Sequence, residues 1–124
     1  MKATRGEVGR WGEALAAKYL REQGYVIEAQ NWRHGHGELD IVARLAEVIV
    51  FVEVRTRRSD AFGRAEESIT RRKRLKLIAT AQAYLDVQAL SPDEVQWQID
   101  VIAVTLKPNH AVETLLHLPA AISA

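Results

Sequence analysis

The sequence contains no cysteine, which excludes a disulfide scaffold, a thiolate zinc site and a cysteine nucleophile. It contains no apolar run near the ~20 residues that span a bilayer, and residues 1–15 lack the continuous apolar core of a signal peptide. Only three prolines occur, all beyond residue 90, and no proline- or glycine-rich linker divides the chain. We therefore expect a cytoplasmic protein with no membrane partner and a single domain over residues 1–124.

Net charge is also nearly absent, because 17 basic residues almost balance 16 acidic ones and leave +1. The 48% hydrophobic and 27% charged content is typical of a folded protein rather than a disordered one. A chain of this length buries roughly two-thirds of its unfolded surface, so it can form a core without disulfides. Taken alone, the small net charge argues against a polyanionic partner.

Hydrophobic periodicity predicts two helices and five strands in the order αβββαββ. The connection through the second helix allows two parallel strands, so we expect an α/β fold with a central mixed sheet flanked by helices. Thr70 is expected to cap the second helix and Gly24 to end the first. We expect Leu75, Ile78, Leu85 and either Ala81 or Gln82 to face the core. The helices are expected at 7–23 and about 71–90, and the strands at 25–33, 37–45, 48–57, 97–106 and about 112–118.

Alternating β-branched residues between Gly37 and Arg57 predict a hairpin with Ala46 and Glu47 in its turn. In that register, opposed residues have numbers that sum to 93, and the apolar rows share one face. The turn lacks the glycine or Asn-Gly of a tight hairpin, so sums of 91 and 95 remain open. The expected apolar pairs are Leu39 with Val54, Ile41 with Val52, and Ala43 with Val50.

The same register places Asp40 opposite Glu53 and Glu38 opposite Arg55. Two carboxylates held that close either raise the pKa of one of them or recruit a cation. Carboxylate oxygens suit Mg²⁺ or Mn²⁺ better than zinc. The alternative is a solvated strand face, but the apolar neighbours of both acids favour a covered pair that needs a partner.

The charge is unevenly distributed along the chain. Residues 55–76 contain nine basic and three acidic side chains, a net charge of +6, whereas the remainder carries −5. Basic side chains in the first turn of a helix are repelled by the positive end of the helix dipole. A phosphate bound there is stabilised by the dipole and by the basic side chains. We therefore expect these residues to contact phosphate. The alternative is a charged surface that is merely solvated. The expected nucleic-acid-binding residues are Arg57, Arg58, Arg71, Arg72, Lys73, Arg74 and Lys76.

Glu38-x-Asp40 followed by Glu53-Val54-Arg55 on the next strand resembles the PD-(D/E)xK nuclease motif. The blocks GRWGEALAAKYLREQGY, NWR, GELDIVA, FVEVRTR and DVIAV resemble the YraN-like family of bacterial proteins, related to archaeal Holliday-junction resolvases. The resemblance runs from about residue 6 to 117. It implies a restriction-endonuclease-like fold and a metal-dependent endonuclease that hydrolyses phosphodiesters of DNA, including branched or junction DNA.

The resemblance also implies roles for single residues. Asp40 and Glu53 would bind Mg²⁺ or Mn²⁺, with the Val54 carbonyl as a third ligand. Glu13 matches the helical glutamate that completes the site in resolvases, and Glu38 would support the other catalytic groups.

Arg55 departs from the motif, which has lysine there. Arginine stays charged and cannot act as a general base, although it can hold a phosphate. This leaves open whether Lys73 or Lys76 substitutes, and it favours an alternative function: a catalytically silent adaptor that binds nucleic acid or protein. A symmetric homodimer would suit a four-way junction.

Three further polar residues carry weaker signals. His34 and His36 bracket Gly35, and two histidines without a third ligand are weak evidence for a metal site. Asp100 lies within an apolar strand, and we interpret it as structural.

Overall fold

The computed structural model describes residues 3–60 and 69–123, in which two helices and five strands follow the predicted order αβββαββ. The sequence also predicts a loop around Gly63, and this segment, with Arg64 of the basic run, lies outside the described residues. No described helix has the length and apolar character needed to cross a membrane. The elements are α1 (Arg5–Glu22), β1 (Val26–His34), β2 (Gly37–Leu45), β3 (Val48–Arg58), α2 (Arg71–Val87), β4 (Gln96–Leu106) and β5 (Val112–Ile122).

All five strands form one mixed sheet in the order β1-β2-β3-β4-β5. Short connections make the pairs β1–β2, β2–β3 and β4–β5 antiparallel. The β3–β4 pair is parallel because the chain passes through α2 between these strands and returns in the same direction. The expected mixed α/β sheet is therefore confirmed.

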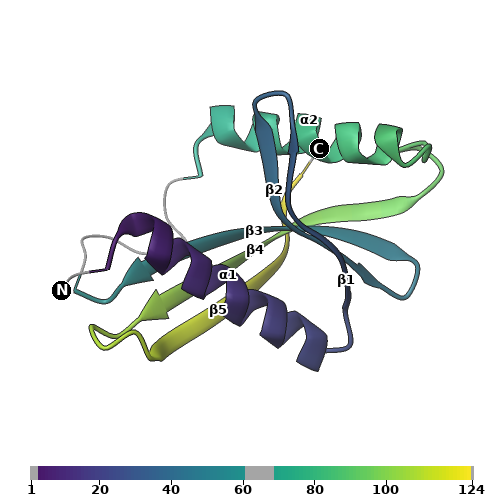
Figure 1. The fold of residues 1–124 in the computed structure, drawn as a ribbon. Coiled ribbons are helices and arrows are strands. Elements are labelled where there is room, and N and C mark those ends of the chain that lie inside the picture. Colours follow the sequence, from purple (N-terminus) through teal and green to yellow (C-terminus); the bar gives the residue numbers. More distant parts are fainter. Residues whose placement is uncertain (1–2, 61–68, 124) are drawn as a thin grey trace.

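The two helices cover opposite faces of this sheet (Figure 1). On the α1 side, Ala16 and Leu20 pack in one apolar cluster with Ile41 of β2. On the α2 side, Leu85 packs in a second cluster with Phe51 of β3. The sheet is thus buried on both faces, which explains why β3 and β4 have near-continuous apolar sequences.

The apolar face of α2 differs from the prediction at Leu75, whose residue surface is 54% exposed. Ala81, rather than Gln82, and Leu85 are buried, and Ile78 packs against the same cluster. Leu75 precedes Ala81 by six residues, which at 3.6 residues per turn places it about 120° around the helix. The stripe facing the sheet therefore excludes Leu75.

Local chemistry sets the ends of the elements. Thr4 forms a capping box with Glu7, so α1 begins two residues earlier than predicted. The Thr70 hydroxyl accepts the Lys73 N–H as expected, and Gly24 has φ +93° just beyond the C-cap of α1. β5 continues past Pro119, which is tolerated because β5 is an edge strand.

Candidate functional site

The β2–β3 hairpin has the predicted register, with numbers that sum to 93, so the sums of 91 and 95 are excluded. Its paired residues run from the turn only as far as Ile41 and Val52. Beyond that point β2 stays paired with β1, and β3 stays paired with β4. The sheet therefore divides between β2 and β3, and Figure 1 shows the β1–β2 hairpin turning away from β3 toward α2.

This division corrects three predicted pairs, because neither Leu39 with Val54, nor Asp40 with Glu53, nor Glu38 with Arg55 is paired in the ladder. Leu39 does not face Val54 in the ladder, but is buried in the cluster on the α2 side. The backbone N–H of Val54 instead donates to Asp40 Oδ2 at 2.8 Å. A side chain of β2 thus takes the place of a strand partner for β3, and it holds the Asp40 carboxyl at the point where the strands separate.

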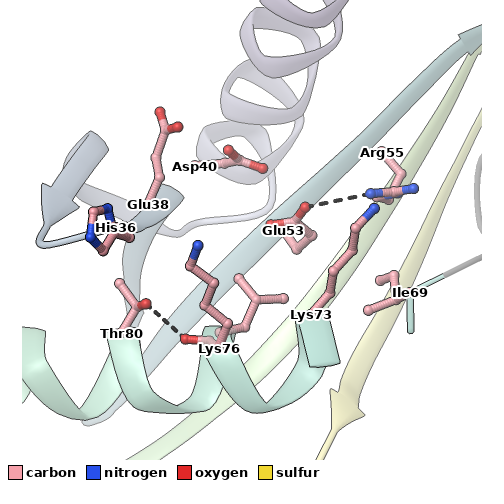
Figure 2. Close-up of a pocket in the computed structure, with 10 residues that line it drawn as sticks. His36, Glu38, Asp40, Glu53, Arg55, Ile69, Lys73, Lys76 and Thr80 are labelled. Atoms are coloured by element: carbon pink, nitrogen blue, oxygen red, sulfur yellow. Dashed lines mark hydrogen bonds and ion pairs between the residues drawn. The ribbon is translucent and has the colours of Figure 1, made fainter. Parts of the chain in front are cut away.

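A pocket of about 390 Å³ lies at this division, between the two strands and α2. Its volume falls in the range of small-ligand sites. It brings together the predicted catalytic residues Glu38, Asp40, Glu53 and Arg55 with two lysines of α2 (Figure 2). The lining residues are His36, Glu38, Asp40, Glu53, Arg55, Ile69, Lys73, Lys76, Leu77 and Thr80.

The environment of Asp40 strongly disfavours its charged form. Burial raises the pKa of Asp40 to about 8, and repulsion by Glu53 adds to the effect. The hydrogen bond from Val54 acts in the opposite direction but is outweighed, and Glu13 and Glu38 raise the pKa further. A carboxyl in this state gains from any cation placed beside it.

Glu53 is the second carboxyl of the pair. Burial raises its pKa, while Arg55, a hydrogen bond with Asp40 and the charge of Lys73 lower it. The Glu53 Oε1 atom lies 3.9 Å from Arg55 Nη1, and the side chains are only 18% and 24% exposed. Asp40 and Glu53 therefore titrate as a coupled pair in a partly dehydrated site.

The basic residues of α2 divide into two groups. Lys73 and Lys76 are three residues apart, one helical turn, and both line the pocket, with their amines directed toward the carboxylates in Figure 2. The other predicted phosphate-binding residues of α2, Arg71, Arg72 and Arg74, are exposed and do not line it. The sequence could not separate the two groups of basic residues, because the basic residues from 71 to 76 follow no helical periodicity.

The two predicted cations at the end of β3 lie outside the pocket lining. Arg58 binds Asp60 through two hydrogen bonds of 3.1 and 3.0 Å, so its charge is already matched locally. The Arg57 side chain also has a partner. Arg58 is therefore less suited to phosphate binding than Lys73 and Lys76.

Glu13 lies just outside the pocket lining but belongs to the same group of charges, because it repels both Asp40 and Glu53. Glu13 comes near the pocket because α1 packs closely on β3 at the neighbouring Gly12, where a Cβ would overlap the Thr56 side chain. No signal in the sequence pointed to a role for Asn31, whose amide contacts both Glu13 and Glu38.

The donor set fits a hard divalent cation. In the described part of the chain no three His, Asp or Glu side chains converge as a complete ligand cage. Mg²⁺ is commonly held by one or two carboxylates, with water and substrate phosphate completing its shell. Asp40 and Glu53 supply two such carboxylates, and their mutual repulsion supplies the reason to bind a cation.

Comparison with known sequences finds a family that this chain matches. A model of the family described as "Uncharacterised protein family UPF0102" matches residues 12–104. The chain belongs to the UPF0102 family. A UPF0102 protein of Roseiflexus castenholzii is 43% identical over 122 residues, which cover 98% of each chain. One from Herpetosiphon aurantiacus is 44% identical over 110 residues, covering 86% of this chain and 87% of the relative.

UPF0102 is the YraN-like family, so the resemblance stated for the sequence blocks is confirmed. A third UPF0102 protein, from Chloroflexus aurantiacus, is 44% identical over 113 residues and 91% of each chain. The matched region includes Glu13, both strands of the divided hairpin and the pocket face of α2.

Proposed function

We propose that this UPF0102 protein is a metal-dependent endonuclease that hydrolyses phosphodiester bonds of DNA, with a restriction-endonuclease-like fold. The α/β architecture, with Asp40 and Glu53 on adjacent inner strands of a mixed sheet where these strands separate, supports that fold. Branched or junction DNA is the substrate class that we propose to test first, in accord with the resemblance to junction resolvases.

One observation carries the proposal. The half-buried carboxylates Asp40 and Glu53 face the amines of Lys73 and Lys76 across a single pocket (Figure 2). Carboxylates suit a divalent cation, and amines suit the oxygens of a phosphate. Phosphodiester hydrolysis requires both at one place, because the backbone must be held while charge develops on its oxygens.

The chain's own residues have distinct tasks in this proposal. Lys73 and Lys76 bind the phosphate from the α2 side, and Arg55 stabilises the negative charge that develops on it. Arg55 also remains close to Glu53, which keeps its guanidinium inside the pocket. Glu38 and Glu13 complete the acidic side of the site.

Mg²⁺ or Mn²⁺ would be held by Asp40 and Glu53, with the Val54 carbonyl proposed as a third ligand. When bound, the cation would supply an activated water and stabilise the leaving oxygen. The acidic pair binds it best with both carboxyls ionised, so the cation would reverse the preference of Asp40 for its neutral form.

The test is cleavage of labelled duplex, single-stranded, flapped and four-way DNA with Mg²⁺ or Mn²⁺. We expect Asp40→Asn and Glu53→Gln to abolish cleavage while each variant remains folded. Glu22→Gln is the matched control, because Glu22 is an exposed carboxylate on α1 that pairs only with Lys18 among the described residues. Cleavage that survives both pocket substitutions contradicts the assigned site.

A second candidate function is a nucleic-acid-binding or protein-binding adaptor without turnover. Arg55 favours it, because arginine replaces the lysine of the nuclease motif and already pairs with Glu53. DNA binding that falls with salt, together with no cleavage in either metal, would support the adaptor. In that case Lys73→Ala and Lys76→Ala should weaken binding, whereas Asp40→Asn should not.

A further inference from the structure

The side chain of Asn31 joins two carboxylates from different elements. Its Nδ2 amide donates to Glu13 Oε2 of α1 at 2.9 Å and to Glu38 Oε1 of β2 at 3.4 Å. An amide nitrogen carries two hydrogens, so a single Asn31 can serve both acceptors. No other described residue donates a hydrogen bond to the Glu13 carboxylate.

The backbone places Asn31 for this contact. Its neighbours Gln30 and Trp32 pair with Ile41 and Leu39, so Asn31 lies across from Asp40 on the adjacent strand. Asn31 has φ +51°, a left-handed conformation in the middle of a strand. Asparagine adopts this region more readily than most residues, and such conformations are concentrated at functional sites.

Without the amide, nothing among the described contacts would keep Glu13 and Glu38 together, since like charges repel. Glu13 would then turn toward solvent, away from the pocket. With the amide in place, the negative charge of Glu13 acts on both Asp40 and Glu53 from the α1 side. The Asn31 contact therefore sets how much acidic charge surrounds the pocket.

We propose that Asn31 is a positioning residue that holds Glu13 beside Asp40 and Glu53 and thereby strengthens divalent-cation binding. This inference rests on the proposed function, because it assigns Asn31 a role in the same cation site. Asn31 touches neither the cation nor the DNA, and acts only through the Glu13 carboxylate.

Mn²⁺ binding, measured by electron paramagnetic resonance on the full chain, provides the first test. Asn31→Gly retains access to positive φ but removes the amide, and we expect about tenfold weaker binding, as for other residues that orient metal ligands. Glu13→Gln should weaken binding similarly. In the Glu13→Gln background, Asn31→Gly should weaken Mn²⁺ binding by less than a further factor of about two, because the two residues act as one unit.

Asn109→Gly is the control, because the one hydrogen bond of the Asn109 side chain among the described residues lies within its own turn, and Mn²⁺ affinity should stay unchanged. Unchanged affinity in Asn31→Gly, or an equal loss with and without Glu13, overturns the proposal. Wild-type protein that binds no Mn²⁺ contradicts the proposed function itself, and the inference fails with it.

A metal-free measurement separates these failures. The side-chain amide resonances of Asn31, observed by NMR without metal, should shift in Glu13→Gln but not in Glu22→Gln. Absence of that shift means that the contact does not exist in solution, and it overturns the inference even if the protein cleaves DNA. If the resonances shift but the wild type binds no Mn²⁺, the Asn31 contact exists and the proposed cation site is wrong.

Discussion

Asp40 and Asp100 are aspartates on strands of one sheet, but Asp40 is half-buried and Asp100 fully buried, and their surroundings differ. Asp100 is fully buried and accepts hydrogen bonds of 2.8 Å from both Gln98 Nε2 and the Ala120 N–H. Its other oxygen lies 2.7 Å from His117 Nε2. Its carboxylate is thus satisfied by three partners from its own and the adjacent strand.

Asp40 has a different set of neighbours. It accepts one backbone N–H, from Val54, and faces the repelling carboxylates of Glu53, Glu13 and Glu38. Burial and repulsion raise its pKa to about 8. The comparison teaches that depth of burial alone does not distinguish a structural acid from a candidate functional one. The distinction lies in whether the fold supplies enough donors or leaves that task to a ligand.

The largest expected effect is at Asp100. Asp100→Ala leaves His117, Gln98 and the Ala120 N–H without their acceptor, which should cost about 3–5 kcal/mol in the free energy of unfolding. Urea denaturation measures the loss. Asp93→Ala, on an exposed turn, should change stability by less than about 0.5 kcal/mol. A loss at Asp100 as small as that at Asp93 would mean that the network is not structural.

Asp40→Asn should increase the free energy of unfolding, whereas Asp100→Ala lowers it. In the unfolded chain this carboxyl ionises near pH 4, whereas in the folded protein it ionises near pH 8. Wild-type stability therefore falls between these values, by about 1.4 kcal/mol per pH unit at most. In EDTA, the variant should gain about 3 kcal/mol over wild type between pH 5.5 and 8.

Thermal or urea unfolding across that pH range checks this difference, which should level off above pH 8. The gain should be absent in Glu22→Gln, which changes an exposed carboxylate. A difference that does not vary with pH would show that Asp40 is not held in its neutral form.

Added Mn²⁺ should stabilise the wild type by binding only the folded state. At about one hundred times the dissociation constant, the gain is about 2.7 kcal/mol. Asp40→Asn should lose it, while Asp100→Asn should keep it, provided that this variant folds. Differential scanning fluorimetry with and without Mn²⁺ measures the shift. Equal stabilisation of wild type and Asp40→Asn would place the cation elsewhere.

The smallest expected effect concerns Tyr19, the outermost member of the Asp100 network. Its hydroxyl lies 2.9 Å from His117 Nδ1, so Tyr19→Phe removes one part-buried hydrogen bond. We expect a loss of about 1 kcal/mol in the free energy of unfolding and no change in Mn²⁺ binding. Tyr84→Phe is the control, because no hydrogen bond of its hydroxyl occurs among the described residues.

Much of the fold could be predicted from local pattern. The period-2 alternation of β2 and β3 gave the register with sum 93, because a shift by one residue would expose every apolar side chain. The caps at Thr70 and Gly24 were likewise predictable from local chemistry. Leu75 was assigned wrongly because the stripe that faces the sheet depends on how α2 rotates against β2, which no local rule specifies.

The candidate site was predictable only in part. The hairpin register brought Asp40 near Glu53, but it also predicted a continued ladder that the structure does not have. Asn31 occurs in the block NWR, but the sequence assigned it no role, because its contact with Glu13 depends on how α1 lies against β1. His36 also lines the pocket, although the pair His34 and His36 was only weak evidence for a metal site.

The sequence by itself determined the order of elements, the hairpin register and the concentration of positive charge between residues 55 and 76, because these depend on neighbours along the chain. Only the tertiary structure decided where β2 leaves β3, which lysines of α2 face the opening, and which carboxylate remains without sufficient donors. These features depend on contacts between elements that are far apart in the sequence. The rotation of each helix and the separation of β2 from β3 are set by the packing of the whole core.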